Sequence, residues 1–116
     1  RHQDRSVYAS ISARVGSISD NRLGGWYAYR GSKAAQNMFT KNLSIELGRI
    51  APAAIVVGLH PGTVDTDLSK PFQRNVPREQ LQTVGASVRF LLSVIDGLSP
   101  GDSGKVFDFR GEEIAP

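Results

Sequence analysis

The middle of the chain contains an uninterrupted apolar run that severely restricts the possible folds. Residues 54–59 read Ala-Ile-Val-Val-Gly-Leu, so an extended segment here has no polar side chain on either face. Such strands are buried on both faces, which is typical of parallel sheets whose two faces are covered by helices. Parallel strands in turn need long crossover connections, usually helical, and the flanking sequence must supply them.

A long amphipathic helix is predicted before this strand, starting at about Tyr27. Apolar residues recur there at steps of three and four, namely Ala35, Met38, Phe39, Leu43, Leu47 and Ile50. This period indicates one buried face on a helix of about five turns. Pro52 cannot continue the helix, which therefore ends before it. Earlier still, the alternating residues 6–12 predict a short strand, closed by the Gly-, Ser- and Asn-containing stretch 16–25.

A second helix and a last strand are predicted after the apolar run. His60-Pro61-Gly62 breaks the run, and residues 63–76 read as a long polar loop. Pro77 then opens a helix that ends just before Gly97. One face of it carries Leu81, Val84, Val88, Leu91, Leu92 and Ile95. Residues 101–104 read as a turn, and residues 105–109 alternate as a strand.

This order of elements predicts an α/β fold, with a parallel sheet between two layers of helices and right-handed crossovers. We expect about three strands and two to three helices, which leaves two sheet edges exposed. Most three-layer sheets of this type are larger, so we expect the chain to form only part of one. The chain also begins at Arg1 without an initiator Met or a signal peptide, which likewise indicates a fragment.

The composition argues against several classes of function. The 116 residues contain no Cys, which excludes disulfide scaffolds, cysteine nucleophiles and Cys-based zinc sites. The net charge is only +3 with scattered arginines, so we expect no nucleic-acid partner. No apolar stretch approaches the ~20 residues of a bilayer span, so we expect no membrane partner and a cytoplasmic location. No metal site is expected either from the acidic residues Asp65, Asp67, Glu112 and Glu113.

A tyrosine and a lysine stand four residues apart at the start of the long helix. Tyr29 and Lys33 share one helical face, and their side-chain ends lie within mutual reach. A nearby ammonium favours the phenolate form of a tyrosine, which can then act as a general acid or base on an alcohol or carbonyl. Such pairs are common on helices, so the pair by itself is a weak signal.

The neighbouring segments make the signal specific. Residues 12–18 read Ser-Ala-Arg-Val-Gly-Ser-Ile, residues 24–35 read Gly-Gly-Trp-Tyr-Ala-Tyr-Arg-Gly-Ser-Lys-Ala-Ala, and residues 59–66 read Leu-His-Pro-Gly-Thr-Val-Asp-Thr. From about Val7 onwards the chain resembles the short-chain dehydrogenase/reductase superfamily, in particular the C-factor-like and sniffer-like carbonyl reductases. The resemblance implies the C-terminal part of a single Rossmann-like domain that binds NAD or NADP.

The resemblance assigns roles to the helix residues. Tyr29 would be the catalytic acid/base that protonates the carbonyl oxygen, and Lys33 would stabilise its phenolate and bind the nicotinamide ribose. The superfamily also uses a Ser to polarise the substrate oxygen, but that position holds Ala13. Ser12 is the favoured substitute, although a slip of one residue on a strand turns its side chain to the other face unless a bulge re-aims it. Ser17 is the second candidate, and a third possibility is that neither serine is catalytic.

The exit of the apolar strand corresponds to the superfamily's Pro-Gly loop. By resemblance, the cofactor would contact Pro61, Gly62, Thr63, Val64 and Thr66. The alternative is a tight strand exit with a capped helical turn, and both can hold together. We expect His60 to be structural, since a lone His at a strand exit seldom acts on substrate. Residues 67–76 lie where the superfamily places its substrate lid.

The glycine-rich turn that holds the cofactor pyrophosphate has no counterpart in this sequence. The leading hypothesis is therefore a fragment of an NAD(P)-dependent oxidoreductase that reduces a carbonyl or oxidises an alcohol, with a small-molecule substrate. The alternative is a truncated, non-catalytic remnant that acts as an oligomeric or binding module. A weaker third reading is an epimerase or dehydratase of the same superfamily. Exposed sheet edges also favour a homo-oligomer.

Overall fold

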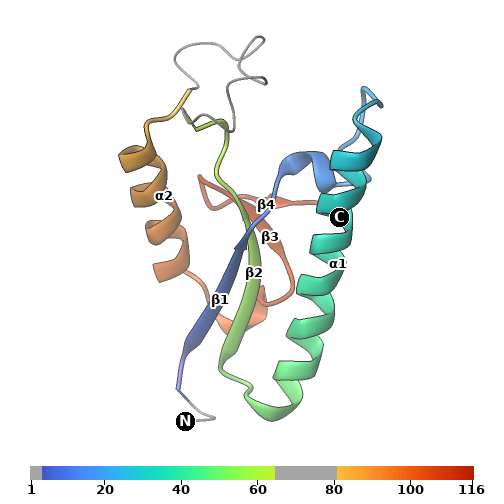
Figure 1. The fold of residues 1–116 in the computed structure, drawn as a ribbon. Helices are drawn as coiled ribbons and strands as arrows, with labels where there is room; N and C mark the ends of the chain where they lie inside the picture. The colour runs from blue at the N-terminus through green and yellow to red at the C-terminus, as the bar shows by residue number, and fades with distance from the viewer. Residues whose placement is uncertain (1–3, 65–80) are drawn as a thin grey trace.

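The computed structural model describes residues 4–64 and 81–116 and shows an open α/β sheet flanked by two helices (Figure 1). The four strands lie in the order β1-β2-β3-β4. β1 and β3 both pair with β2 in parallel, and β4 pairs with β3 antiparallel. The elements along the chain are β1 (Ser6–Ile11), the 3₁₀ turn η1 (Arg14–Gly16), α1 (Tyr27–Ile50), β2 (Ala54–His60), α2 (Val84–Asp96), the 3₁₀ turn η4 (Pro100–Asp102), β3 (Val106–Asp108) and β4 (Glu113–Ile114).

The predicted parallel α/β fold is confirmed, and β4 is the element that the sequence did not reveal. This strand has two residues and pairs Ile114 with Val106 and Glu113 with Phe107. A segment this short carries too few residues for a periodic pattern to appear. Glu113 is therefore part of the sheet.

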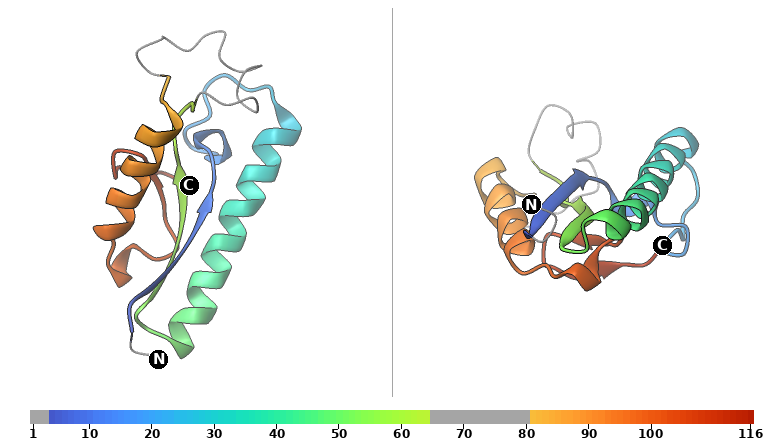
Figure 2. Two further views of the ribbon diagram at one scale, coloured as in Figure 1. Left: turned by 60° about the vertical axis from the view of Figure 1, so that its left-hand side comes forward. Right: turned by 90° about the horizontal axis from the view of Figure 1, so that it is seen from below.

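The sheet lies between α1 and α2, so three layers are present (Figure 2). On one face, Ile55, Val57 and Leu59 of β2 form a core with Leu98 and Phe107. Leu91, Val94 and Ile95 of α2 pack against this core. On the other face, the one toward α1, Val56 and Gly58 of β2 are buried. A Cβ on Gly58 would lie 3.4 Å from the Cβ of Ser12.

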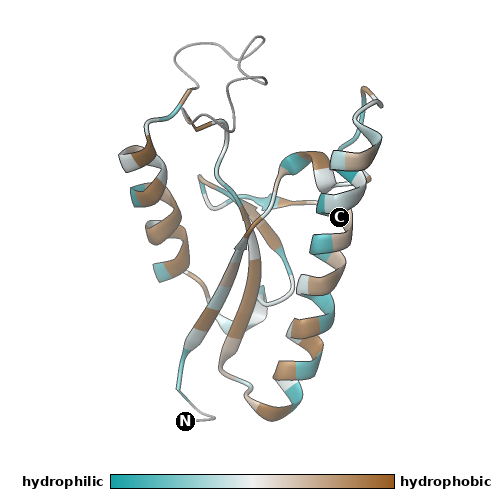
Figure 3. Ribbon diagram, viewed as in Figure 1, coloured by the Kyte–Doolittle hydropathy of each residue, from teal (hydrophilic) through white to brown (hydrophobic). Residues whose placement is uncertain are grey.

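The face of α1 that packs on the sheet differs from the predicted one. Met38 and Phe39, expected to be buried, are 60% and 68% exposed, whereas the polar Thr40 and Ser44 are buried. For Ser44 the reason is its close approach to Gly104, since a Cβ on that glycine would lie 2.7 Å from Ser44 Oγ. Ser44 Oγ keeps its hydrogen bond inside the helix by donating to the carbonyl oxygen of Lys41 at 2.7 Å. Figure 3 shows the result, with α1 mixed in hydropathy and β2 and α2 largely apolar.

The second helix begins later than predicted. α2 starts at Val84, and Thr83 caps it by accepting a hydrogen bond from the Ala86 amide at 3.1 Å. Pro77, the predicted first residue, lies outside the described residues. Leu81 precedes the helix, and the predicted face is only partly the buried one, since Val88 and Leu92 are about half exposed. Thr83 satisfies a free amide at the start of α2, a position where Ser, Thr, Asp and Asn are preferred.

The segment between α2 and β3 is a turn, as predicted, and it anchors β2. Ser103 Oγ accepts a hydrogen bond from the Val56 amide at 2.9 Å, and the Gly104 amide donates to the Val56 carbonyl at 2.6 Å. Gly104 has φ +90°, a conformation that suits glycine.

Within the described residues, no helix has the length and apolarity needed to cross a membrane.

Candidate functional site

The start of α1 lies beside the carboxyl ends of β1 and β2, the edge at which parallel sheets bind ligands (Figure 1). Three successive residues with positive φ, Gly24, Gly25 and Trp26, turn the chain into the helix. A Trp in this region is uncommon. The Arg30 Nε group donates to the Gly25 carbonyl at 3.1 Å and holds the turn against the first helical residues.

Tyr29 and Lys33 meet on one face of α1, as their spacing predicts. Lys33 Nζ lies 5.9 Å from the centre of the Tyr29 ring, and the tyrosine side chain remains accessible at 42% exposure. Lys33 Nζ also donates to the Ile11 carbonyl at 3.4 Å and to Gln36 Oε1 at 3.2 Å. These contacts fasten the ammonium to the carboxyl end of β1. A phenol and an ammonium are thus held together where a ligand can reach them.

The two serines near the expected catalytic position both donate to protein acceptors. Ser12 is 3% exposed, and its Oγ donates to Asn37 Oδ1 on α1 at 2.6 Å. Ser17 is 2% exposed, and its Oγ donates to the Ala115 carbonyl. Ala13 precedes η1 and has no hydroxyl to offer. A hydroxyl has a single proton, so either serine must give up its present bond before it can donate to a substrate oxygen.

The exit of β2 is narrow and ties the chain to the segment before α2. Gly62 has φ +75°, and a Cβ there would lie 2.6 Å from Gln82 Nε2. The Thr63 carbonyl accepts from the Gln82 amide at 2.9 Å, and Val64 forms an isolated bridge with Gln82. Pro61 lies at the start of this exit, half-buried like its neighbours. The structure thus places the expected cofactor residues 61–64 together, whereas Thr66, with the rest of the loop to residue 80, lies outside the described residues.

Buried polar atoms without partners gather at this exit. Gln82 Nε2 and Oε1 and His60 Nδ1 have no hydrogen-bond partner among the described residues. Buried groups of this kind are rare in folded proteins and often indicate a missing water or ligand. Burial, followed by the charge of Arg14, lowers the pKa of His60 to about 4, so the imidazole is neutral near pH 7.

Asp108 is a site residue that sequence reasoning missed. It ends β3 beside His60 in the sheet register and is fully buried. Its Oδ1 accepts from the Arg110 and Glu112 amides at 2.9 and 3.0 Å, and its Oδ2 lies 3.3 Å from an Arg14 nitrogen. Asp108 therefore connects β3 to the 3₁₀ turn after β1. A single acidic residue inside the alternating segment 105–109 was the signal for it.

The described part of the chain holds no group of three or more His, Asp or Glu arranged for a metal ion. What it brings together is an accessible phenol, an ammonium with a donor to spare, and partnerless polar atoms at the neighbouring strand exit. A lysine ammonium has three N–H donors, and two of those of Lys33 are used. This arrangement can transfer a proton at a substrate oxygen and bind hydroxyl or amide groups next to it.

Comparison with known proteins gives relatives but no match to a protein-family model. C-signal of Myxococcus xanthus is 42% identical over 106 residues, which are 91% of this chain and 58% of that protein. A 1-hydroxy-2-glutathionyl-2-methyl-3-butene dehydrogenase of a Rhodococcus species is 41% identical over 96 residues, covering 82% of this chain and 40% of that one. The chain thus spans about half the length of these curated relatives.

Solved structures of two carbonyl reductases resemble the chain over nearly its whole length. The NADPH-bound carbonyl reductase from chicken fatty liver superposes with a TM-score of 0.82 at 34% identity, over 96% of this chain and 43% of that one. The carbonyl reductase Sniffer of Drosophila melanogaster superposes with a TM-score of 0.80 at 32% identity, over 96% of this chain and 41% of that one. The chain belongs to the short-chain dehydrogenase/reductase superfamily, among the proteins similar to C-signal and Sniffer.

Proposed function

We propose that this chain is the C-terminal part of a single NAD(P)-binding domain and serves an oxidoreductase that reduces a small carbonyl compound or oxidises the corresponding alcohol. The observation that carries the proposal is the Tyr29–Lys33 pair at the carboxyl ends of the parallel strands. The carbonyl reductases among the structural neighbours, one of them bound to NADPH, support the reaction class and the cofactor class.

The residues present fit a nicotinamide cofactor in part. The free donor of Lys33 suits a ribose hydroxyl, and the exit of β2 at residues 61–64, with the partnerless Gln82 amide beside it, suits a carboxamide. When bound, the nicotinamide supplies or accepts a hydride. The described residues include no glycine-rich cradle for a pyrophosphate, so that part of the cofactor needs residues beyond these.

Tyr29 moves the proton in this proposal. In reduction its phenol donates to the substrate oxygen, and in oxidation the phenolate accepts the alcohol proton. Lys33 stabilises the phenolate by its charge, from a position fixed by the Ile11 carbonyl and Gln36. Ser12 is our candidate for the hydroxyl that polarises the substrate oxygen, a role in which it must turn away from Asn37.

The proton-transfer role is tested by replacing Tyr29 in the longest natural form of the protein. Tyr29→Phe should lower carbonyl turnover by about 10²–10⁴-fold, the usual contribution of general acid–base catalysis, and leave NADPH affinity nearly unchanged. Tyr27→Phe is the matched control, because Tyr27 lies in the same helical turn and is 90% exposed. Full turnover in Tyr29→Phe would refute the proposal.

The test of the serine role compares Ser12→Ala with Ser17→Ala under the same conditions. We expect the larger loss of kcat in Ser12→Ala. An unchanged kcat in both would leave Tyr29 to act on the substrate oxygen without a serine. Because Ser12→Ala also removes a buried hydrogen bond, the stability of each variant is measured alongside its kcat.

A non-catalytic binding module is the second candidate, and the serine geometry favours it. Ala13 lacks a hydroxyl, and both nearby serines are engaged in buried bonds. An exposed edge at β1, with Tyr8 60% and Ile11 53% exposed, would then serve self-association. Titration of the longest natural form of the protein with NADH and NADPH, followed by thermal shift, separates the two. A shift supports the oxidoreductase, whereas no shift together with a dimer in light scattering supports the module.

A further inference from the structure

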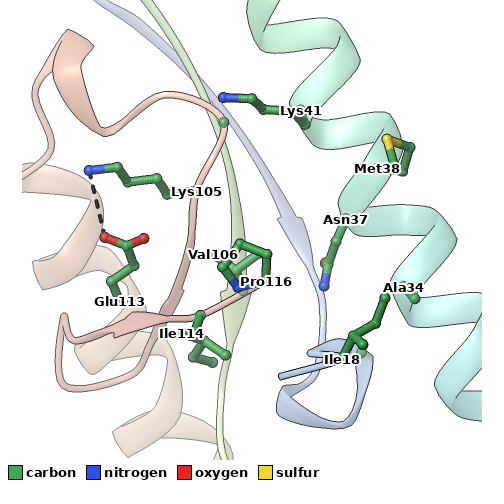
Figure 4. A pocket seen from close by; sticks show the side chains of 13 residues that line it. Ile18, Ala34, Asn37, Met38, Lys41, Lys105, Val106, Glu113, Ile114 and Pro116 are labelled. Carbon is green, nitrogen blue, oxygen red and sulfur yellow. Dashed lines mark ion pairs between the residues drawn. The ribbon is translucent and has the colours of Figure 1, made fainter. Parts of the chain in front are cut away.

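A hollow of about 480 Å³ opens between α1 and the C-terminal strands, and neither Tyr29 nor Lys33 lines it (Figure 4). Its volume falls within the range of roughly 300–1,000 Å³ that is typical of small-molecule sites. One wall is the side of α1 that carries Met38 and Lys41, and the opposite wall is β3 with β4. No step of the proposed reaction uses this space.

Most of the lining is apolar. Ala34 and Met38 of α1 face Val106 of β3 and Ile114 of β4, and Ile18 and Pro116 complete the apolar lining. Ile18 is 79% and Met38 60% exposed, so these side chains lose contact with water only when something occupies the hollow. Covering such a surface is favourable in proportion to the apolar area removed from water.

The charged groups of the hollow lie in the upper and left part of the view in Figure 4, with Lys41 at the top and Lys105 and Glu113 to the left. The Lys41 ammonium has no hydrogen-bond or ion-pair partner among the described residues, and the Cδ of Lys41 lies 3.1 Å from where a Cβ on Gly104 would be. Lys105 pairs with Glu113 across 3.6 Å, and both side chains are close to half exposed. Near Lys41 and Lys105, two side-chain ammonium groups lie around one side-chain carboxylate, so this part of the lining carries one positive side-chain charge in excess.

An apolar wall with one positive side-chain charge in excess is complementary to a molecule with an apolar body and one negative head group. We propose that this hollow binds a medium-chain monocarboxylate. Its hydrocarbon part lies against Met38, Val106 and Ile114, and its carboxylate lies between Lys41 and Lys105. This site is separate from the proposed catalytic one, and its failure would leave the oxidoreductase proposal untouched.

The test begins with three ligands that share a ten-carbon chain. Decanoate, decanol and decylammonium are titrated, below their aggregation concentrations, into the ¹⁵N-labelled full chain, and amide shifts are followed by NMR. We expect shifts centred on the lining residues, with decanoate bound about fivefold more tightly than decanol and decylammonium more weakly than either. Equal affinity for the three ligands, or shifts spread away from the hollow, would overturn the proposal.

Charge variants test the head-group contact. Lys41→Gln should weaken decanoate binding about fivefold, and Glu113→Gln should strengthen it, because the first removes and the second adds net positive charge at the rim. Arg89→Gln is the control, since it removes the same charge from the exposed surface of α2, outside the hollow. Equal weakening in Arg89→Gln and Lys41→Gln would show only general attraction and overturn the site.

A pair of variants on α1 tests the location. Met38→Glu puts a carboxylate on the wall of the hollow and should abolish decanoate binding, whereas Phe39→Glu, one residue further and outside the lining, should not. Both side chains are well exposed, at 60% and 68%, so the fold should tolerate either change. If the same amides shift with protein concentration and no ligand, the occupant is a second copy and the proposal is wrong.

Discussion

Replacing Gly16 with alanine tests how closely the turn after β1 approaches the helix that carries Tyr29 and Lys33. A Cβ on Gly16 would lie 2.9 Å from the backbone carbon of Lys33 and 3.0 Å from Asn37 Nδ2. The first of these atoms belongs to a helix backbone and cannot move aside alone. Insertion of a methyl group into a tight site typically costs 1–3 kcal/mol, so we expect Gly16→Ala to lower the free energy of unfolding by about 2 kcal/mol.

Gly48 is the matched control on the same helix. Its surroundings are open, with no atom within 4 Å of a Cβ there, and it lies inside α1. Alanine favours a helix interior over glycine by up to ~1 kcal/mol, so Gly48→Ala should raise the free energy of unfolding by about that amount. Both variants are measured by urea denaturation followed by circular dichroism. A Gly16→Ala protein as stable as the parent would show that η1 and α1 are not in this close contact.

Three further outcomes follow from particular residues. The pKa of His60 is about 4 in the folded chain, against 6.5 for an ordinary histidine such as that of the unfolded chain. Between these two pH values the unfolded chain binds a proton that the folded chain does not, so the free energy of unfolding should fall as the pH drops from about 6.5 to about 4. His60→Gln should remove that part of the pH dependence in urea titrations at each pH. Asp108→Ala should lower stability by about 2 kcal/mol, since it leaves two amides without their buried acceptor. A loss below about 0.5 kcal/mol in chemical denaturation would contradict that account. Thr83→Ala should cost about 1 kcal/mol through the lost cap of α2, and an unchanged melting temperature would argue against the cap.

Much of the fold could be predicted because its signals are local. The continuous apolar run of β2 implies burial on both faces, and its parallel pairing with β1 and β3 follows the expected topology. The boundaries of α1 follow from its period and from Pro52. The faces of the helices were less predictable, because Ser44 is buried through its close approach to Gly104, a residue distant along the chain.

The candidate site, like the fold, could be predicted from the sequence only in part. The shared helix face of Tyr29 and Lys33 could be predicted from their spacing, since residues four apart on a helix are always neighbours. The bond from Ser12 to Asn37 and the contact between Arg14 and Asp108, a partner 94 residues away along the chain, became visible only in the folded chain. Contacts of that kind depend on how strands and helices pack, and a spacing along the sequence does not encode them.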